Sequence, residues 1–116
     1  MLPFRKILCP TDFSDPSYKG LAAGIELVEY FSAELILINV VTPVYTVGAP
    51  GVPTHYKEAE YYEQMEAAGR QALKEIVDDK RSGSIQTTEV VVRGKAADEI
   101  IARAEKDSVD LIVMAT

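Results

Sequence analysis

Two short runs of almost uninterrupted apolar residues constrain the fold of this chain more than any other feature of its sequence. The first spans residues 35–41 (Leu-Ile-Leu-Ile-Asn-Val-Val), and the second spans residues 110–114 (Asp-Leu-Ile-Val-Met). A strand with one solvated face alternates apolar and polar residues, whereas a strand that is covered on both faces is apolar throughout. We therefore predict that both runs are strands buried on both faces, as in a parallel sheet flanked by helices.

Two further strands and three helices complete the predicted pattern. Residues 6–10 form an aliphatic run, and residues 88–92 form a more mixed one that is typical of a strand nearer the edge of a sheet. Apolar residues recur at helical spacing in the three segments between these strands. The stripes are Tyr18, Leu21, Ala22, Ile25 and Val28; Tyr61, Met65, Ala68, Ala72, Leu73 and Ile76; and Ala97, Ile100, Ile101 and Ala104.

Strands and helices therefore alternate along the whole chain. Right-handed crossovers between successive parallel strands place helices on both faces of one sheet. The expected fold class is α/β, a three-layer sandwich with a mainly parallel four-stranded sheet. A length of 116 residues suits one domain, so we expect a single domain over residues 1–116.

The first helix carries three local signals. Asp15 supplies an N-terminal cap, and Pro16 follows it at the first helical position. Gly20 and Gly24 lie inside the same helix, where each costs roughly 1 kcal/mol of helix stability relative to alanine. We predict that close packing against the sheet compensates for this cost.

The connection after the second strand is rich in residues that break regular structure. It spans residues 42–56 and contains Pro43, Gly48, Pro50, Gly51 and Pro53. We predict a long mobile flap there. The only histidine, His55, lies in this segment without a serine, cysteine or carboxylate at a recognisable catalytic spacing. We therefore expect a protein that is not an enzyme, with any hydrolysis slow and incidental.

Charge and cysteine content exclude several classes of function. The net charge is −6 and the isoelectric point is near 4.7, and no cluster of lysine and arginine is long enough to bind nucleic acid. Cys9 is the only cysteine, so we expect no intrachain disulfide, no thiolate metal cluster and no bound metal. No signal peptide and no apolar stretch of about 20 residues is present. We expect a cytoplasmic protein that does not bind membranes.

Candidate functional residues follow the strands. Ligands of such folds bind beyond the carboxyl ends of the parallel strands. These ends precede residues 10–14, 40–42, 93–95 and 115–116. Asp12 can accept hydrogen bonds from ribose hydroxyls, and the main chain near Val40 can pair with an adenine edge. Gly94 allows a backbone conformation that a side chain forbids. A second interpretation of Asp12 is that it caps a turn before the first helix.

Four segments resemble the universal stress protein family. They are residues 6–14 (Lys-Ile-Leu-Cys-Pro-Thr-Asp-Phe-Ser), 37–41, 91–101 and 110–116, and they occur in the family's order. Asn39 stands where the family often has histidine. The resemblance implies an adenine-nucleotide alpha-hydrolase-like fold with strand order 3-2-1-4, and a role in stress responses.

The resemblance also implies a site for ATP or another adenine nucleotide. Its residues would be Pro10, Thr11, Asp12, Val40, Gly94, Met114 and Ala115. In ATP-binding members a loop of pattern Gly-x-x-Gly, nine residues and Gly-Ser or Gly-Thr follows the fourth strand and holds the phosphates. Ala115 stands at its first glycine, and the sequence ends at Thr116. We therefore expect a C-terminally incomplete domain that binds ATP weakly, with adenosine nearly as good.

Two related folds require residues that this sequence lacks, and one alternative function remains. A phosphoacceptor receiver domain needs paired acidic residues after the first strand and an aspartate after the third, but Asp12 has no acidic neighbour and Arg93 takes the latter place. A flavodoxin-like domain needs a longer phosphate loop than residues 11–14 provide. The alternative function is an interaction module without a nucleotide. The fourth strand, expected to expose one edge, predicts a homodimer or larger homo-oligomer, and any other protein partners are unknown.

Overall fold

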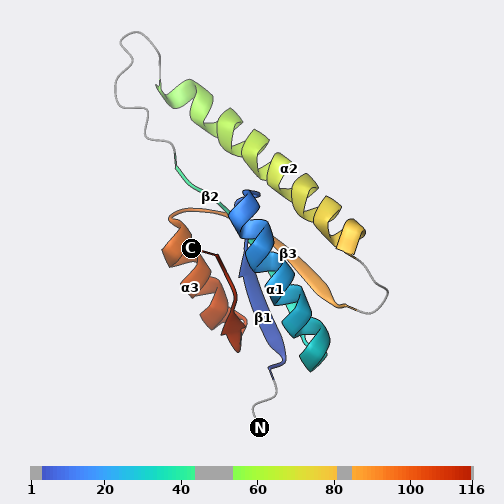
Figure 1. Ribbon diagram of the computed structural model, residues 1–116. Coiled ribbons are helices and arrows are strands. Elements are labelled where there is room, and N and C mark those ends of the chain that lie inside the picture. Colours follow the sequence, from blue (N-terminus) through green and yellow to red (C-terminus); the bar gives the residue numbers. More distant parts are fainter. Residues whose placement is uncertain (1–3, 44–53, 81–84, 116) are drawn as a thin grey trace.

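The computed structural model describes residues 4–43, 54–80 and 85–115 (Figure 1). Strands and helices alternate in the predicted order. The elements are β1 (Lys6–Pro10), α1 (Asp15–Phe31), β2 (Glu34–Val41), α2 (Thr54–Lys80), β3 (Thr87–Arg93), α3 (Ala96–Lys106) and β4 (Leu111–Ile112).

The four strands form one parallel sheet of order β3-β2-β1-β4, as expected. Helices α1 and α2 lie side by side on one face of this sheet, and α3 covers the other face (Figure 1). The mixed strand at residues 88–92 corresponds to β3 at an edge, as its composition predicts. The predicted three-layer α/β fold is confirmed.

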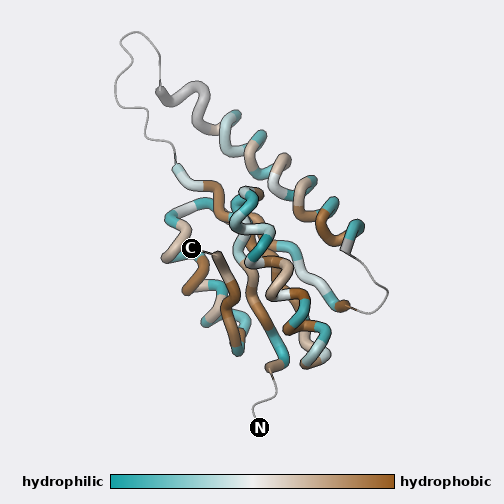
Figure 2. The backbone as a smooth tube through the Cα atoms, in the orientation of Figure 1, coloured by the Kyte–Doolittle hydropathy of each residue, from teal (hydrophilic) through white to brown (hydrophobic). Residues whose placement is uncertain are grey.

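Burial of β2 on both faces creates two separate cores. Leu35 and Leu37 pack under α1 and α2, whereas Ile36 and Ile38 pack with Ile100 of α3. Hydrophobic residues accordingly run along the central strands in Figure 2. The prediction for residues 35–41 is therefore correct.

The prediction that residues 110–114 are buried on both faces is wrong. Strand β4 comprises only Leu111 and Ile112, while Ile112 is 38% exposed and Met114 is 52% exposed. Among the described strands β4 pairs with β1 alone, so one side of it has no neighbour. An apolar run reports which residues are able to be buried, but it does not report which elements are present to cover them.

Two predicted boundaries also shift. The cap of α1 is Ser14 rather than Asp15, because the Ser14 Oγ accepts a 3.3 Å hydrogen bond from the Ser17 N–H and Asp15 is already helical. Helix α2 begins at Thr54, so His55 falls within it rather than in a loop. The remainder of the predicted flap, residues 44–53, lies outside the described residues.

The predicted close packing of the two glycines in α1 is confirmed. A Cβ at Gly24 would overlap the Cys9 Sγ of β1, and one at Gly20 would lie 2.8 Å from the backbone nitrogen of Ala115. Cys9 itself is completely buried, and this burial raises the pKa of its thiol to about 12. Cys9 therefore acts as a small core residue, as its place in an apolar strand predicts.

We expect Gly24→Ala to destabilise the protein although alanine is the better helix former. Overpacking costs about 1–3 kcal/mol and exceeds the gain in helix propensity, which is roughly 1 kcal/mol. Urea unfolding of the variant measures the difference. In a Cys9→Ala background the same change should cost less, because the Sγ is gone and the Cys9 Cβ lies at an ordinary 3.9 Å. A Gly24→Ala protein as stable as the parent would contradict the packing.

The beginning of β1 is tied to β4 by one carboxylate. The Asp110 Oδ2 accepts hydrogen bonds from the backbone N–H of Arg5 at 2.8 Å and of Lys6 at 3.0 Å. The hydrogen bond from the Arg5 amide has the largest effect and that from the Lys6 amide the next largest, and together they hold the pKa of Asp110 below its usual value of 3.8. These bonds favour the ionised form, so the folded state prefers a charged Asp110 more than the unfolded state does.

This preference has a defined pH dependence. The stability that ionised Asp110 adds is fully present above its unfolded pKa of 3.8, and it is lost as the pH falls through the lower folded value. Asp110→Asn should therefore lower the melting temperature at pH 7. In acid the difference in melting temperature between the variant and the parent protein should become smaller. Calorimetry from pH 7 to pH 2 measures this, with Glu89→Gln on the exposed part of β3 as a charge-matched control. A difference in melting temperature that is the same at every pH would contradict the stabilising role of ionised Asp110.

Candidate functional site

A cleft of about 340 Å³ lies at the carboxyl ends of β1 and β2. Its walls come from the loop after β1, the start of α1, the end of β2, the start of α3 and the residues after β4. The lining residues are Pro10, Thr11, Asp12, Ser14, Pro16, Ser17, Ile38, Val40, Ala96, Ile100, Met114 and Ala115. Its volume lies within the range of small-molecule sites, about 300–1,000 Å³.

Most of the sequence-predicted residues meet in this cleft. Those that line it are Pro10, Thr11, Asp12, Val40, Met114 and Ala115. The predicted set lacks the other lining residues, which are Ser14, Pro16, Ser17, Ile38, Ala96 and Ile100. A signal for Ile38 was present, because residues two apart on a strand share a face.

Gly94 does not line the cleft. Its φ of 144° lies in the region that favours glycine, and its N–H donates a 3.1 Å hydrogen bond to the Val41 carbonyl. A Cβ at this position would also lie 2.6 Å from the Glu99 Oε1. Gly94 therefore shapes the turn between β3 and α3, as its predicted backbone freedom suggests.

The loop after β1 is fixed by the hydrogen bonds of Thr11. The Thr11 N–H donates to the Ile38 carbonyl at 2.9 Å. Its buried Oγ1 accepts from the Phe13 N–H at 3.0 Å and lies 2.9 Å from the Ser17 Oγ. Phe13 adopts a left-handed conformation with φ of 66°. The loop thus has one defined shape that turns the chain sharply into α1.

Asp12 is exposed at the rim of the cleft. Its Oδ1 accepts hydrogen bonds from the backbone N–H of Ser14 at 3.0 Å and from the Ser14 hydroxyl. The Ser14 hydroxyl, followed by the Ser14 backbone N–H, holds the pKa of Asp12 below its usual value. Asp12 therefore caps the turn before α1, as the second interpretation of this residue predicts. Its ionised carboxylate also borders the cleft.

Val40 presents main-chain groups to the same cleft. Pairing of β1 with β2 ends where Pro10 lies opposite Ile38, whose carbonyl accepts from Thr11. In a parallel strand alternate residues direct their N–H and C=O to opposite neighbours, and Val41 directs its carbonyl to Gly94 after β3. The N–H and C=O of Val40 therefore point to the β1 side, where no described residue pairs with them. They form a donor and acceptor pair beside apolar walls.

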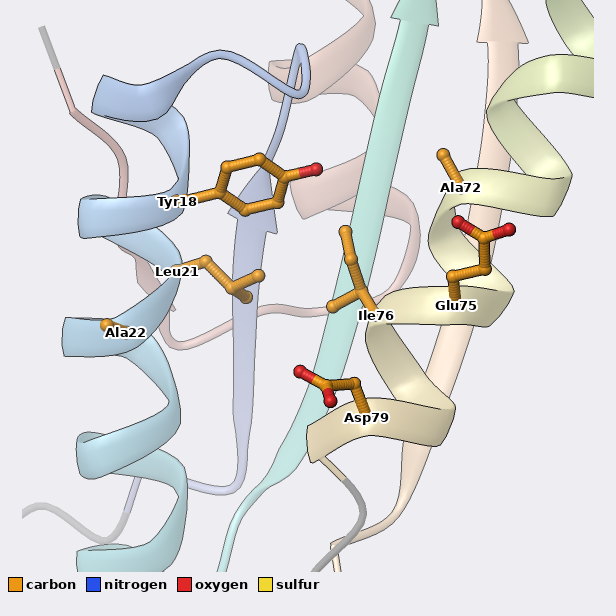
Figure 3. Close-up of a pocket in the computed structure, with 7 residues that line it drawn as sticks. All are labelled: Tyr18, Leu21, Ala22, Ala72, Glu75, Ile76 and Asp79. Carbon is orange, nitrogen blue, oxygen red and sulfur yellow. The ribbon is translucent and has the colours of Figure 1, made fainter.

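A second hollow, of about 420 Å³, lies between α1 and α2 (Figure 3). Figure 3 shows Tyr18 projecting from α1 towards α2, with Ile76 and Asp79 projecting back from α2. The polar groups that line it are exposed, and the Glu75 Oε1 already accepts a 3.2 Å hydrogen bond from Gln71. This hollow lies over a face of the sheet, so it has no strand-end main-chain groups. The cleft at the strand ends is the better candidate site.

The described residues show neither a metal-binding group nor a membrane-spanning helix. Among the side chains that the structure describes, in residues 4–43, 59–79 and 85–115, no group of three or more histidine, cysteine, aspartate or glutamate residues is placed to hold a metal ion. None of the described helices is long and apolar enough to cross a membrane.

Comparison with known proteins gives consistent matches. The model of the universal stress protein family matches residues 3–116. Universal stress protein MJ0531 of Methanocaldococcus jannaschii is 32% identical over 113 residues, which are 97% of this chain and 65% of that protein. The chain thus spans slightly less than two thirds of that relative.

Solved structures share the fold. A universal stress protein from Burkholderia pseudomallei superposes with a TM-score of 0.81 at 23% identity, covering 97% of this chain and 82% of the other. A universal stress protein in complex with cAMP gives a TM-score of 0.66 at 20% identity, covering 97% and 77% of the two chains. At these identities the similarity shows the fold alone. The ligand of this chain has to be inferred from the residues of its own cleft.

Proposed function

The chain belongs to the universal stress protein family, and on that basis we propose that it is a stress-response regulatory module that binds an adenine nucleotide. The nucleoside part would occupy the cleft at the ends of β1 and β2. ATP, cAMP and adenosine are the ligands to test. The observation that carries this proposal is the main-chain N–H and C=O of Val40 beside that cleft, with which no described residue pairs.

The chemistry of the cleft suits a purine nucleoside. An adenine edge offers one donor and one acceptor side by side, which matches the N–H and C=O of Val40. Ile38, Ile100 and Met114 supply apolar surface for a planar ring. The ionised Asp12 at the rim can accept hydrogen bonds from ribose hydroxyls, and such charge-assisted bonds are stronger than neutral ones. The cAMP complex of a protein with the same fold supports the choice of an adenine ligand.

We expect Asp12→Asn to weaken adenosine binding by about tenfold and to lower the melting temperature slightly, because the contact with Ser14 loses its charge. The amide oxygen of asparagine still accepts from the Ser14 N–H, but the charge-assisted bond to ribose becomes a neutral one. Titration calorimetry with adenosine, cAMP and ATP measures the affinities.

Two controls make this test specific. Asp15→Asn removes a neighbouring carboxylate that does not line the cleft and should leave the affinity unchanged. A deoxyadenosine that lacks the bonded hydroxyl should bind the parent protein and Asp12→Asn equally. A lower melting temperature for Asp12→Asn with unchanged adenosine affinity would assign Asp12 to the turn alone.

Self-association is the second candidate function, in which the chain acts as an interaction module. Among the described strands β4 has a partner on one side only, which leaves backbone groups at its edge. Ile112 on that strand is 38% exposed, and Ile101 on α3 is 55% exposed. Unpaired strand edges and exposed apolar side chains both favour association, and a two-fold dimer is the commonest result.

Light scattering of the purified chain at micromolar concentration tests this candidate. We expect a mass of at least a dimer for the parent protein and a shift towards monomer for Ile112→Lys. Tyr30→Lys on α1 is the control, because Tyr30 is 81% exposed yet lies on another element. A parent protein that is monomeric, with slow amide exchange along β4, would rule the candidate out.

A further inference from the structure

We propose that Asn39 is a positioning residue, whose buried side-chain amide links α2 to the loop after β1 and holds that loop in the shape that binds the ligand. The inference rests on the proposed function in that the ligand is an adenine nucleoside. The position of the loop can be measured in the absence of any ligand. Asn39 does not line the cleft and so acts through Thr11 and Asp12.

Asn39 and Thr11 are the two buried polar residues in the described part of the chain, and they bond to each other. Asn39 is 8% exposed and Thr11 is 5% exposed. The Asn39 Nδ2 donates a 2.9 Å hydrogen bond to the Thr11 carbonyl across 28 positions of sequence. A buried carbonyl without a partner is costly, so this bond determines where the Thr11 carbonyl points.

Helix α2 is shaped to accept the Asn39 side chain. Gly69 is buried at the contact, and a Cβ there would lie 2.6 Å from the Asn39 Oδ1. Glycine inside a helix costs roughly 1 kcal/mol relative to alanine, so its place in α2 needs a compensating contact. The amide of Asn39 supplies it, because only a residue without a side chain leaves room for the Oδ1.

The bond is transmitted to Asp12 through the backbone. The Thr11 N–H is held by Ile38, and the Thr11 carbonyl is held by Asn39. Both peptide groups that flank Thr11 are therefore fixed, and the second of them sets the direction of Asp12. The contacts of Asp12 with Ser14 depend on this direction, so they report on the loop even when no ligand is present.

The test combines two variants with one control. Asn39→Leu has nearly the same shape but removes the amide, and Gly69→Ala displaces it from the side of α2. Leu35→Val is the control, because it shortens a buried side chain on the same face of β2 at the position opposite Ile7, away from the loop after β1. For each protein we would measure the Asp12 pKa by NMR titration, the adenosine affinity by calorimetry and the melting temperature.

We expect both Asn39→Leu and Gly69→Ala to raise the pKa of Asp12 towards its usual value and to weaken adenosine binding roughly fivefold. Leu35→Val should lower the melting temperature alone. An unchanged Asp12 pKa in both variants, or a raised pKa with unchanged adenosine affinity, would overturn the inference. If the pKa rises and the parent protein binds no adenosine, the loop-positioning role stands and the proposed function fails.

Discussion

Strand β1 stops while β2 continues beside it, and the candidate site depends on this difference in length. The register places Pro10 opposite Ile38, so Asn39, Val40 and Val41 extend past the last residue of β1. Each of the three then has a separate task. Asn39 bonds the departing loop, Val40 offers its main chain to the cleft, and Val41 continues the pairing with β3. A β1 two residues longer would pair with Val40 and close the cleft from within.

Two glycines let the helices α1 and α2 pack close to these strands. Gly24 lets α1 approach the sulfur of Cys9 in β1, and Gly69 lets α2 approach the amide of Asn39 in β2. In both cases the strand contributes a side chain that ends in a sulfur or an amide, and the helix contributes a glycine that leaves room for it. The packing is therefore specific to these pairs, and the same helices carrying alanine would have to stand further from the sheet.

Much of the fold was predictable because β2 has a composition that only a doubly covered strand tolerates, and most of the cleft followed from the rule that ligands lie at strand ends. The errors have physical causes. Ser14 and Asp15 are both good caps, so adjacent candidates could not be separated without the backbone. Residues 110–114 are apolar enough for burial, but exposure depends on neighbours. The Asn39–Thr11 bond joins residues far apart in sequence and leaves no periodic signal. The main chain near Val40 was predicted as a ligand contact, but the side to which its N–H and C=O point follows only from the register.

The two cores are unequal, which bears on what a bound ligand would stabilise. The cluster under α1 and α2 contains buried residues from both helices, whereas α3 contributes Ile100 as its buried residue to the smaller cluster. Local unfolding takes place most readily where few apolar contacts must be broken. Helix α3 is thus held to the sheet by fewer buried side chains than α1 or α2, and it also carries Ala96 and Ile100 of the cleft. A molecule bound in the cleft would add contacts to α3 where the sandwich has the fewest, and it would thereby stabilise the packing of α3 on the sheet.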